Sequence, residues 1–162
     1  HTLTDMDEVV VTMHTESGLL DELDAGVSLE EAEAQLLAYV RSHVPEPRKA
    51  PLAGSSVHVD RAYLARDMPA FTEHLHYRIV DVSSIKELVR RWYPRAYFAS
   101  PNKRGGHRAL ADILDSINEL RYYREAVFVP APGPNSEDAK AITDALDSER
   151  DRSEQPVDSV TD

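Results

Sequence analysis

Apolar residues recur at helical spacing through the first part of the chain. From Met6 to about Leu23 they fall mostly three and four positions apart, which predicts a helix interrupted near Ser17-Gly18. A Ser followed three residues later by Glu, at 28–31, is a capping box that begins a second predicted helix, and Pro45 ends it. Two amphipathic helical segments are therefore expected before any strand.

Two short stretches have the pattern of buried strands. Residues 50–53 are a short apolar run, and residues 77–82 are rich in β-branched side chains. Helical spacing follows each of them, from about Arg61 to Met68 and then from a second capping box at Ser84 to just before Pro94. Two strand-then-helix units predict an α/β layer with short parallel strands.

The final third of the chain divides into a loop, a helix and a tail. Residues 94–106 are basic and aromatic without helical spacing, which predicts a long loop facing a substrate. A helix is expected from about 110 to 126, with a core stripe formed by Leu110, Ile113, Leu114, Ile117 and Leu120. One folded domain is thus expected over 1–134. Residues 135–162 are expected to form an acidic, disordered tail in which 139–146 could be transiently helical.

Composition limits the chemistry that the chain can carry. With 162 residues and 41% hydrophobic content, it can form one domain with a sizeable core. It has no cysteine, so disulfides and thiolate metal sites are excluded, and carboxylates or histidines would hold a hard ion. No leader-like start and no run of 18 apolar residues is present, so a cytoplasmic protein with no membrane partner is expected.

The charge is distributed unevenly. The net charge is −11, and residues 135–162 carry −6 of it, from nine acidic and three basic side chains. Residues 86–108 carry seven basic side chains against one acid, a net +6. Such a patch suits a small substrate with one or two phosphates, whereas double-stranded nucleic acid requires a broad basic face. The alternative is an ordinary solvated helix face and loop.

His107 and Asp112 form one candidate pair, a base and a metal ligand at a predicted helix start. Five residues of helix turn by about 500°, so two helical side chains at this spacing would point roughly 140° apart. They converge only if His107 lies in the preceding turn, which Gly105 and Gly106 permit. The alternative is a simple helix start whose Asp complements the helix dipole.

Asp60 is the second candidate. It lies where the connection between the first predicted strand and its helix ends, a common place for functional residues in α/β proteins. The alternative is an N-cap role, for which Asp is well suited.

Taken together, these stretches resemble the oligoribonucleases, which are 3′-to-5′ exonucleases of the ribonuclease H-like fold. The likeness runs from about residue 6 to residue 134 and includes 54–64, 76–88 and 90–94. Asp60 matches the family's second acidic motif, and His107 with Asp112 matches the third. The resemblance implies that Asp60 and Asp112 bind Mn²⁺ or Mg²⁺, two ions in the complete family site, and that His107 is the general base.

The resemblance also implies substrate contacts and a partner. Ser56, Arg78 and Ser83 correspond to positions that contact the far phosphate of a very short single-stranded oligoribonucleotide. Tyr77 resembles a tyrosine that reaches the partner's site in a homodimer, and His14 a histidine that contacts substrate. As alternatives, Ser83 could merely precede a helix cap, Arg78 could pair with a carboxylate, and Tyr77 could belong to the core.

Part of the family pattern is missing from the sequence. The first motif, an Asp-x-Glu on a strand, does not precede Gly54, and the acidic cluster at 5–8 instead opens a helical pattern. Ser55 stands where the family usually has asparagine, and Val9 where some members have tryptophan. We therefore expect an incomplete, helix-rich ribonuclease H-like fold that lacks its N-terminal antiparallel strands. Such a chain is expected to be nearly inactive, or to be a non-catalytic remnant that dimerises or binds nucleotides.

Overall fold

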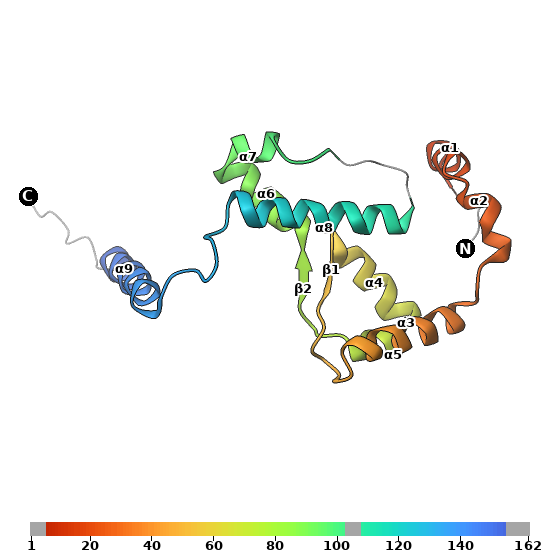
Figure 1. Ribbon diagram of the computed structural model, residues 1–162, viewed down its shortest axis with the longest axis horizontal. Coiled ribbons are helices and arrows are strands. Elements are labelled where there is room, and N and C mark those ends of the chain that lie inside the picture. The colour runs from red at the N-terminus through yellow and green to blue at the C-terminus, as the bar shows by residue number, and fades with distance from the viewer. Residues whose placement is uncertain (1–5, 103–107, 155–162) are drawn as a thin grey trace, which may run out of the picture. The chain divides into compact units, whose positions relative to one another are not determined.

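The chain forms two compact units, His1–Val127 and Phe128–Asp162 (Figure 1). The structure, a computed structural model, describes residues 6–102 and 108–154. The helices and strands of the first unit follow the chain in this order: α1 (Glu8–Glu16), α2 (Leu19–Glu22), the 3₁₀ helix η2 (Leu23–Ala25), α3 (Leu29–His43), β1 (Leu52–Gly54), α4 (Val57–Asp67), α5 (Pro69–His74), β2 (Ile79–Asp81), α6 (Val82–Trp92), α7 (Pro94–Phe98) and α8 (Ala109–Ala126).

The first helices follow the sequence pattern closely. Gly18 adopts φ 71°, a left-handed conformation that glycine takes without a steric penalty, and this residue separates α1 from α2 as expected. The Ser28 side chain caps α3 by accepting a hydrogen bond from the backbone N–H of Glu31 at 3.1 Å. Both predictions are confirmed because they depend on local backbone chemistry.

β1 and β2 form a parallel pair, as the alternation of strands and helices predicts. Leu52 pairs with Ile79 and Gly54 with Asp81, and α4 and α5 make the connection between the strands. In the described part of the chain this pair is the whole sheet. A parallel pair needs such a long crossover, which leaves both strands with their carboxyl ends at the same edge.

The main apolar cluster lies near the start of β1, away from the carboxyl ends of the two strands. Met68, Phe71 and Leu75 are buried, and partly buried side chains of α3, β1 and α4 pack against them. A hydrogen bond also joins α3 and α5: the backbone N–H of Phe71 donates to the Glu33 carboxylate at 3.0 Å. This cluster fixes α3 and α5 together and leaves the other end of the sheet for α6 and α8.

The predicted core stripe of α8 is wrong. Leu110, Ile113, Leu114 and Ile117 are exposed, with Leu110 at 69%, and Leu120 is half-buried. The side chains that α8 buries are Ser116, Glu119 and Tyr123. The reason is that α8 contacts α6 and β1, and it does so through its polar and aromatic face. Helical periodicity identified the amphipathic helix but not the face that has a neighbour.

Three predicted boundaries also change. α4 begins at Val57 rather than near Arg61, and Ser56 is its N-cap. α6 begins at Val82 because the Asp81 side chain accepts the backbone N–H of Ser83 at 2.9 Å, so the capping box predicted at Ser84 does not start the helix. The predicted loop from 94 contains the short helix α7.

The second unit contains α9 (Ser136–Glu154). This helix is longer than the transient one expected within a disordered tail. Its start is capped by Asn135, which accepts the backbone N–H of Asp138 at 2.8 Å, and Lys140 pairs with Asp144 one turn later. Its described side chains are exposed. Across the described ranges, no helix is both long and apolar enough to cross a lipid bilayer.

Candidate active site

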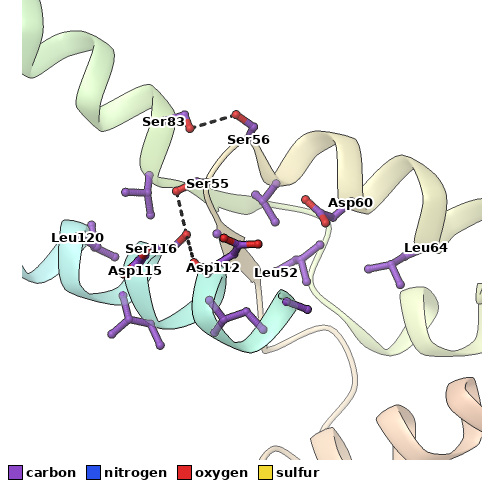
Figure 2. A pocket seen from close by; sticks show the side chains of 17 residues that line it. Leu52, Ser55, Ser56, Asp60, Leu64, Ser83, Asp112, Asp115, Ser116 and Leu120 are labelled. Carbon is purple, nitrogen blue, oxygen red and sulfur yellow. Dashed lines mark hydrogen bonds between the residues drawn. The ribbon is translucent and has the colours of Figure 1, made fainter. Parts of the chain in front are cut away.

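A cavity of about 880 Å³ lies where the carboxyl end of β1 meets α4, α6 and α8 (Figure 2). Apolar side chains such as Leu52, Leu64 and Ile117 form part of its wall. Polar side chains also line it, namely Ser55, Ser56, Asp60, Ser83, Asp112, Asp115 and Ser116. A concave, partly apolar site with a few convergent polar groups is the usual form of a small-molecule binding site.

Two carboxylates 52 positions apart in the sequence line this cavity. Asp60 lies in the first turn of α4 and Asp112 in the first turn of α8, and both are exposed. Figure 2 shows them projecting from the two helices toward the space between them. Each carboxylate complements the positive end of its own helix dipole. The N-cap role considered for Asp60 is excluded, because Ser56 occupies that position.

A pair of serines joins the two helices that carry these carboxylates. The hydroxyls of Ser55 and Ser116 lie 2.9 Å apart, and the Ser116 hydroxyl donates to the backbone carbonyl of Asp112 at 2.9 Å. The Ser55 hydroxyl therefore donates to Ser116. This chain of hydrogen bonds ties the turn that enters α4 to the turn of α8 that holds Asp112 (Figure 2).

A second pair of serines lies on another part of the cavity wall. The hydroxyls of Ser56 and Ser83 are 3.1 Å apart, although 27 residues separate them. Each belongs to the start of a helix, α4 for Ser56 and α6 for Ser83. The two helix N-termini bring two partial positive charges to one place, where the Asp81 carboxylate accepts a backbone N–H from each of them.

Tyr77 and Arg78 lie just before β2 and do not line this cavity. Tyr77 is 70% exposed, so the core role considered for it is wrong. The Arg78 Nε donates to the Tyr77 hydroxyl at 3.0 Å, and the guanidinium lies 5.4 Å from the centre of the Tyr77 ring. The two side chains thus form one exposed cationic and aromatic unit.

His14 lies on α1 and does not line the cavity. Its Nδ1 is buried and has no hydrogen-bond partner in the ranges that the structure describes. Arg108, the N-cap of α8, contacts the segment that follows α1. It forms an ion pair with Glu22 and donates to the backbone carbonyl of Ser17. The hydrogen bond from Arg108, together with its charge, lowers the pKa of Glu22. His107 itself lies outside the described residues.

The sequence was compared with known proteins. Residues 2–120 match the family model RNase_T, described as exonuclease. An oligoribonuclease of Streptomyces avermitilis is 71% identical over 140 residues, which is 86% of this chain and 70% of the relative. An oligoribonuclease of Rhodococcus jostii is 57% identical over 145 residues, 89% of this chain and 73% of the relative. The chain belongs to the oligoribonuclease family of exonucleases. It is therefore an exoribonuclease by class.

Members of the exonuclease family typically use divalent metals, and the donors present here fit such an ion in kind. Asp60 and Asp112 supply carboxylate oxygens, the ligands that hard divalent cations prefer. In the described part of the chain, no three His, Cys, Asp or Glu side chains gather closely enough to hold a metal ion. By themselves, the two carboxylates would supply only part of the coordination shell of such an ion.

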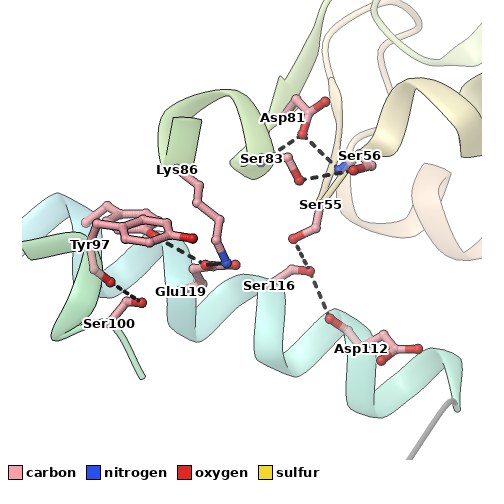
Figure 3. Close-up of polar contacts among 11 residues, drawn as sticks. Ser55, Ser56, Asp81, Ser83, Lys86, Tyr97, Ser100, Asp112, Ser116 and Glu119 are labelled. Atoms are coloured by element: carbon pink, nitrogen blue, oxygen red, sulfur yellow. Dashed lines mark hydrogen bonds and ion pairs between the residues drawn. The ribbon is translucent and has the colours of Figure 1, made fainter. Parts of the chain in front are cut away.

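The structure adds a buried polar network that the sequence analysis missed. The Lys86 ammonium on α6 lies 2.8 Å from the Glu119 carboxylate on α8, which also accepts the Tyr123 hydroxyl at 3.2 Å (Figure 3). Burial raises the pKa of Tyr123 to about 12, and the Glu119 charge adds to this. The network fixes α6 against α8, the two helices that present Ser83 and Asp112.

Two residues that line the cavity, and Asp81 beside it, were also missed. Asp115 and Ser116 lie on the polar face of α8, which the prediction of an apolar core stripe left out of account. Asp81 lies directly between a strand and a helix start, where an Asp is a typical N-cap, but the Ser84 capping box seemed to fill that role. Two sequence signals could have identified these residues: the polar positions between the apolar residues of α8, and an Asp directly after a strand.

Proposed function

We propose that this protein is a 3′-to-5′ exoribonuclease that degrades very short oligoribonucleotides, from dinucleotides to a few nucleotides, by two-metal hydrolysis of the phosphodiester bond. The observation that carries the proposal is the pair Asp60 and Asp112, which face one cavity from two helices. The paired hydroxyls of Ser56 and Ser83 on the same cavity wall support it. Membership of the oligoribonuclease family supplies the reaction class.

Each residue has a proposed role in the reaction. Asp60 and Asp112 hold Mn²⁺ or Mg²⁺, and His107 accepts the proton of the attacking water. When bound, the divalent ions stabilise negative charge on the scissile phosphate and lower the pKa of the attacking water. An imidazole suits the proton transfer because its intrinsic pKa, about 6.5, leaves it neutral at physiological pH.

The proposed substrate is short because the cavity is small. A volume of about 880 Å³ is in the range of small-ligand sites, which suits a very short oligonucleotide. Ser56 and Ser83 would bind the far phosphate with their hydroxyls, and Arg78 would add a charge-assisted hydrogen bond. His14 would contact the substrate from α1. An RNA substrate also favours a cytoplasmic location, and we propose neither a duplex nucleic acid nor a membrane as partner.

The proposed catalytic centre needs more ligands than Asp60 and Asp112 supply. Because no strand-like Asp-x-Glu precedes Gly54, we propose that these 162 residues bind metal weakly and hydrolyse RNA slowly. A non-catalytic protein that binds nucleotides or dimerises is the alternative.

We also propose that the protein is a homodimer. Leu88 and Trp92 lie one helical turn apart on α6 and are both exposed, which gives that helix an apolar surface suited to a second copy. Tyr77, which is exposed as well, would then reach the partner's site. Light scattering should give twice the chain mass, and Trp92→Asp should shift the protein toward the monomer. A monomeric protein before substitution would contradict this proposal.

The proposed activity is tested by hydrolysis of a 5′-labelled diribonucleotide in Mn²⁺. We expect slow cleavage by the 162-residue chain and much faster cleavage by a version extended upstream with an Asp-x-Glu strand, since loss of a metal site costs several kcal/mol of transition-state stabilisation. Full activity of the short chain would contradict the proposed shortage of ligands. If both versions bind the dinucleotide and neither cleaves it, the non-catalytic alternative holds.

A further inference from the structure

We propose that Asp81 is a positioning residue that holds Ser56 and Ser83 in the geometry that binds a terminal phosphate. The inference rests on the proposed function, because it assigns that phosphate to the two serines. Asp81 is the last residue of β2, and its side chain is nearly buried at 12% exposure. Asp81 does not line the cavity that holds Asp60 and Asp112, but with Ser56 and Ser83 it borders a second, smaller hollow beside it. The positioning role is assigned because Asp81 Oδ1 is hydrogen-bonded to the backbone of both serines.

One carboxylate oxygen of Asp81 binds the starts of two helices. Asp81 Oδ1 accepts the backbone N–H of Ser56 at 2.9 Å and the backbone N–H of Ser83 at 2.9 Å (Figure 3). Ser56 is the N-cap of α4, and Ser83 lies in the first turn of α6. Because the two amides share one acceptor atom, their side chains are brought together, and the two hydroxyls lie 3.1 Å apart.

The backbone of Ser56 shows why such a clamp is needed. Ser56 has φ 55° and ψ 30°, in the left-handed region that residues with a Cβ rarely adopt. Its own side chain makes no cap hydrogen bond to α4, so the hydroxyl is directed to Ser83 instead. The hydrogen bond from the Ser56 N–H to Asp81, the last residue of β2, stabilises this conformation. Without it, Ser56 would relax to an ordinary conformation and turn its hydroxyl elsewhere.

The proposal assigns the role to the acceptor geometry of Asp81 Oδ1, whereas the other oxygen, Oδ2, lies 3.4 Å from His58 Nδ1. The carboxylate already occupies both backbone donors, so an incoming phosphate meets the serine hydroxyls rather than the helix amides. Asparagine has one side-chain carbonyl oxygen with two lone pairs, which can accept the same two N–H groups. Glutamate keeps the charge but displaces the oxygen by one methylene. These two substitutions therefore separate geometry from charge.

The test measures affinity of the full chain for a diadenylate with a 5′-phosphate and for the same diadenylate without it. The titrations are followed by NMR amide shifts in EDTA, so that no hydrolysis occurs. We expect the phosphate to improve the affinity of the unsubstituted protein about tenfold or more, as hydrogen bonds to a charged group usually do. The ratio of the two affinities, with the 5′-phosphate over without it, should fall to within about twofold of one in Asp81→Ala and Asp81→Glu. It should stay within about threefold of the original value in Asp81→Asn.

Two further measurements make the result decisive. Asp67→Asn is the matched control, because it removes a carboxylate at the far end of α4, about 16 Å of helix from Ser56, and should leave the ratio unchanged. If Asp81→Ala fails to fold, the Asn and Glu variants still decide. Loss of the ratio in Asp81→Asn, or its retention in Asp81→Glu, would overturn the positioning role. If the unsubstituted protein shows no phosphate preference, the serine site of the proposed function fails instead.

Discussion

At the scale of single residues, Tyr123 shows how burial changes chemistry. Its side chain is fully buried, and burial with the nearby Glu119 carboxylate raises its pKa to about 12. An unfolded chain would ionise this tyrosine near pH 10, whereas the folded protein keeps it neutral. The stability that Tyr123 contributes is therefore fully present below about pH 10. It is lost as the pH rises toward 12.

This linkage gives the first prediction. Between pH 9 and pH 12 the free energy of unfolding of the protein should fall by about 2 kcal/mol more than that of Tyr123→Phe, measured by urea unfolding. Tyr39→Phe, which removes the hydroxyl of an exposed tyrosine, serves as the matched control. If the free energy of unfolding depended on pH in the same way in the protein and in Tyr123→Phe, the raised pKa of Tyr123 would be contradicted.

The proposed catalytic residues give the second prediction. In the version extended with an Asp-x-Glu strand, His107→Ala should lower kcat by roughly 10²- to 10⁴-fold and leave Mn²⁺ affinity nearly unchanged, as expected for loss of a general base. Asp112→Asn should instead weaken Mn²⁺ binding in calorimetry. His43→Ala, on the exposed end of α3, is the control and should be neutral. An active His107→Ala variant would refute the proposed base.

At the scale of elements, α6 and α8 are joined by an ion pair between the half-buried Lys86 and the buried Glu119. Glu119 is 5% exposed, and the Lys86 ammonium lies 2.8 Å from its carboxylate. Removing Lys86 takes away a cation that stabilises the buried Glu119 charge, and the loss of one partner of such a pair costs more than the pair itself contributes. The position of Ser83 on α6 relative to Asp112 on α8 thus depends on Lys86 and Glu119, which do not line the cavity.

This leads to the third prediction. Lys86→Met should lower the free energy of unfolding by about 3 kcal/mol, and the double variant Lys86→Met with Glu119→Gln should recover much of that loss. Chemical unfolding followed by circular dichroism measures both. Arg90→Met, also on α6 but paired with the exposed Glu87, is the matched control and should change stability by less than about 1 kcal/mol. A double variant no more stable than Lys86→Met would rule out this account.

The elements that depend on local chemistry could be predicted from the sequence. The break at Gly18 and the cap at Ser28 follow from residues within one helical turn. Asp81 and Ser116 could not be identified in this way, because their partners lie 25 and 61 positions away. The candidate site itself came from the family likeness. Helical spacing alone would have placed the exposed apolar face of α8 in the core.

At the scale of the whole molecule, the chain has two units with different relations to the proposed function. All residues that line the described cavity belong to His1–Val127. The second unit holds α9, whose described side chains are exposed and whose cap and ion pair are local. A helix held by such contacts contributes little to the stability of a neighbouring domain.

The fourth prediction follows. Truncation after Pro134 should change the melting temperature by no more than about 2 °C, within the range of surface substitutions. Truncation after Leu120 is the control, and it should abolish cooperative unfolding because it removes the buried Tyr123. A marked fall in melting temperature on removal of 135–162 would show that α9 supports the first unit.

The exposed face of α8 affects how such melting experiments can be read. Leu110, Ile113, Leu114 and Ile117 offer a continuous apolar strip on the folded protein. Environment-sensitive dyes such as ANS fluoresce when they bind apolar surface, so they should give a bright signal before any heating. A dye-based thermal shift would then start high and show a shallow transition even for a protein that unfolds sharply. Far-UV ellipticity, which follows the backbone, is insensitive to this strip.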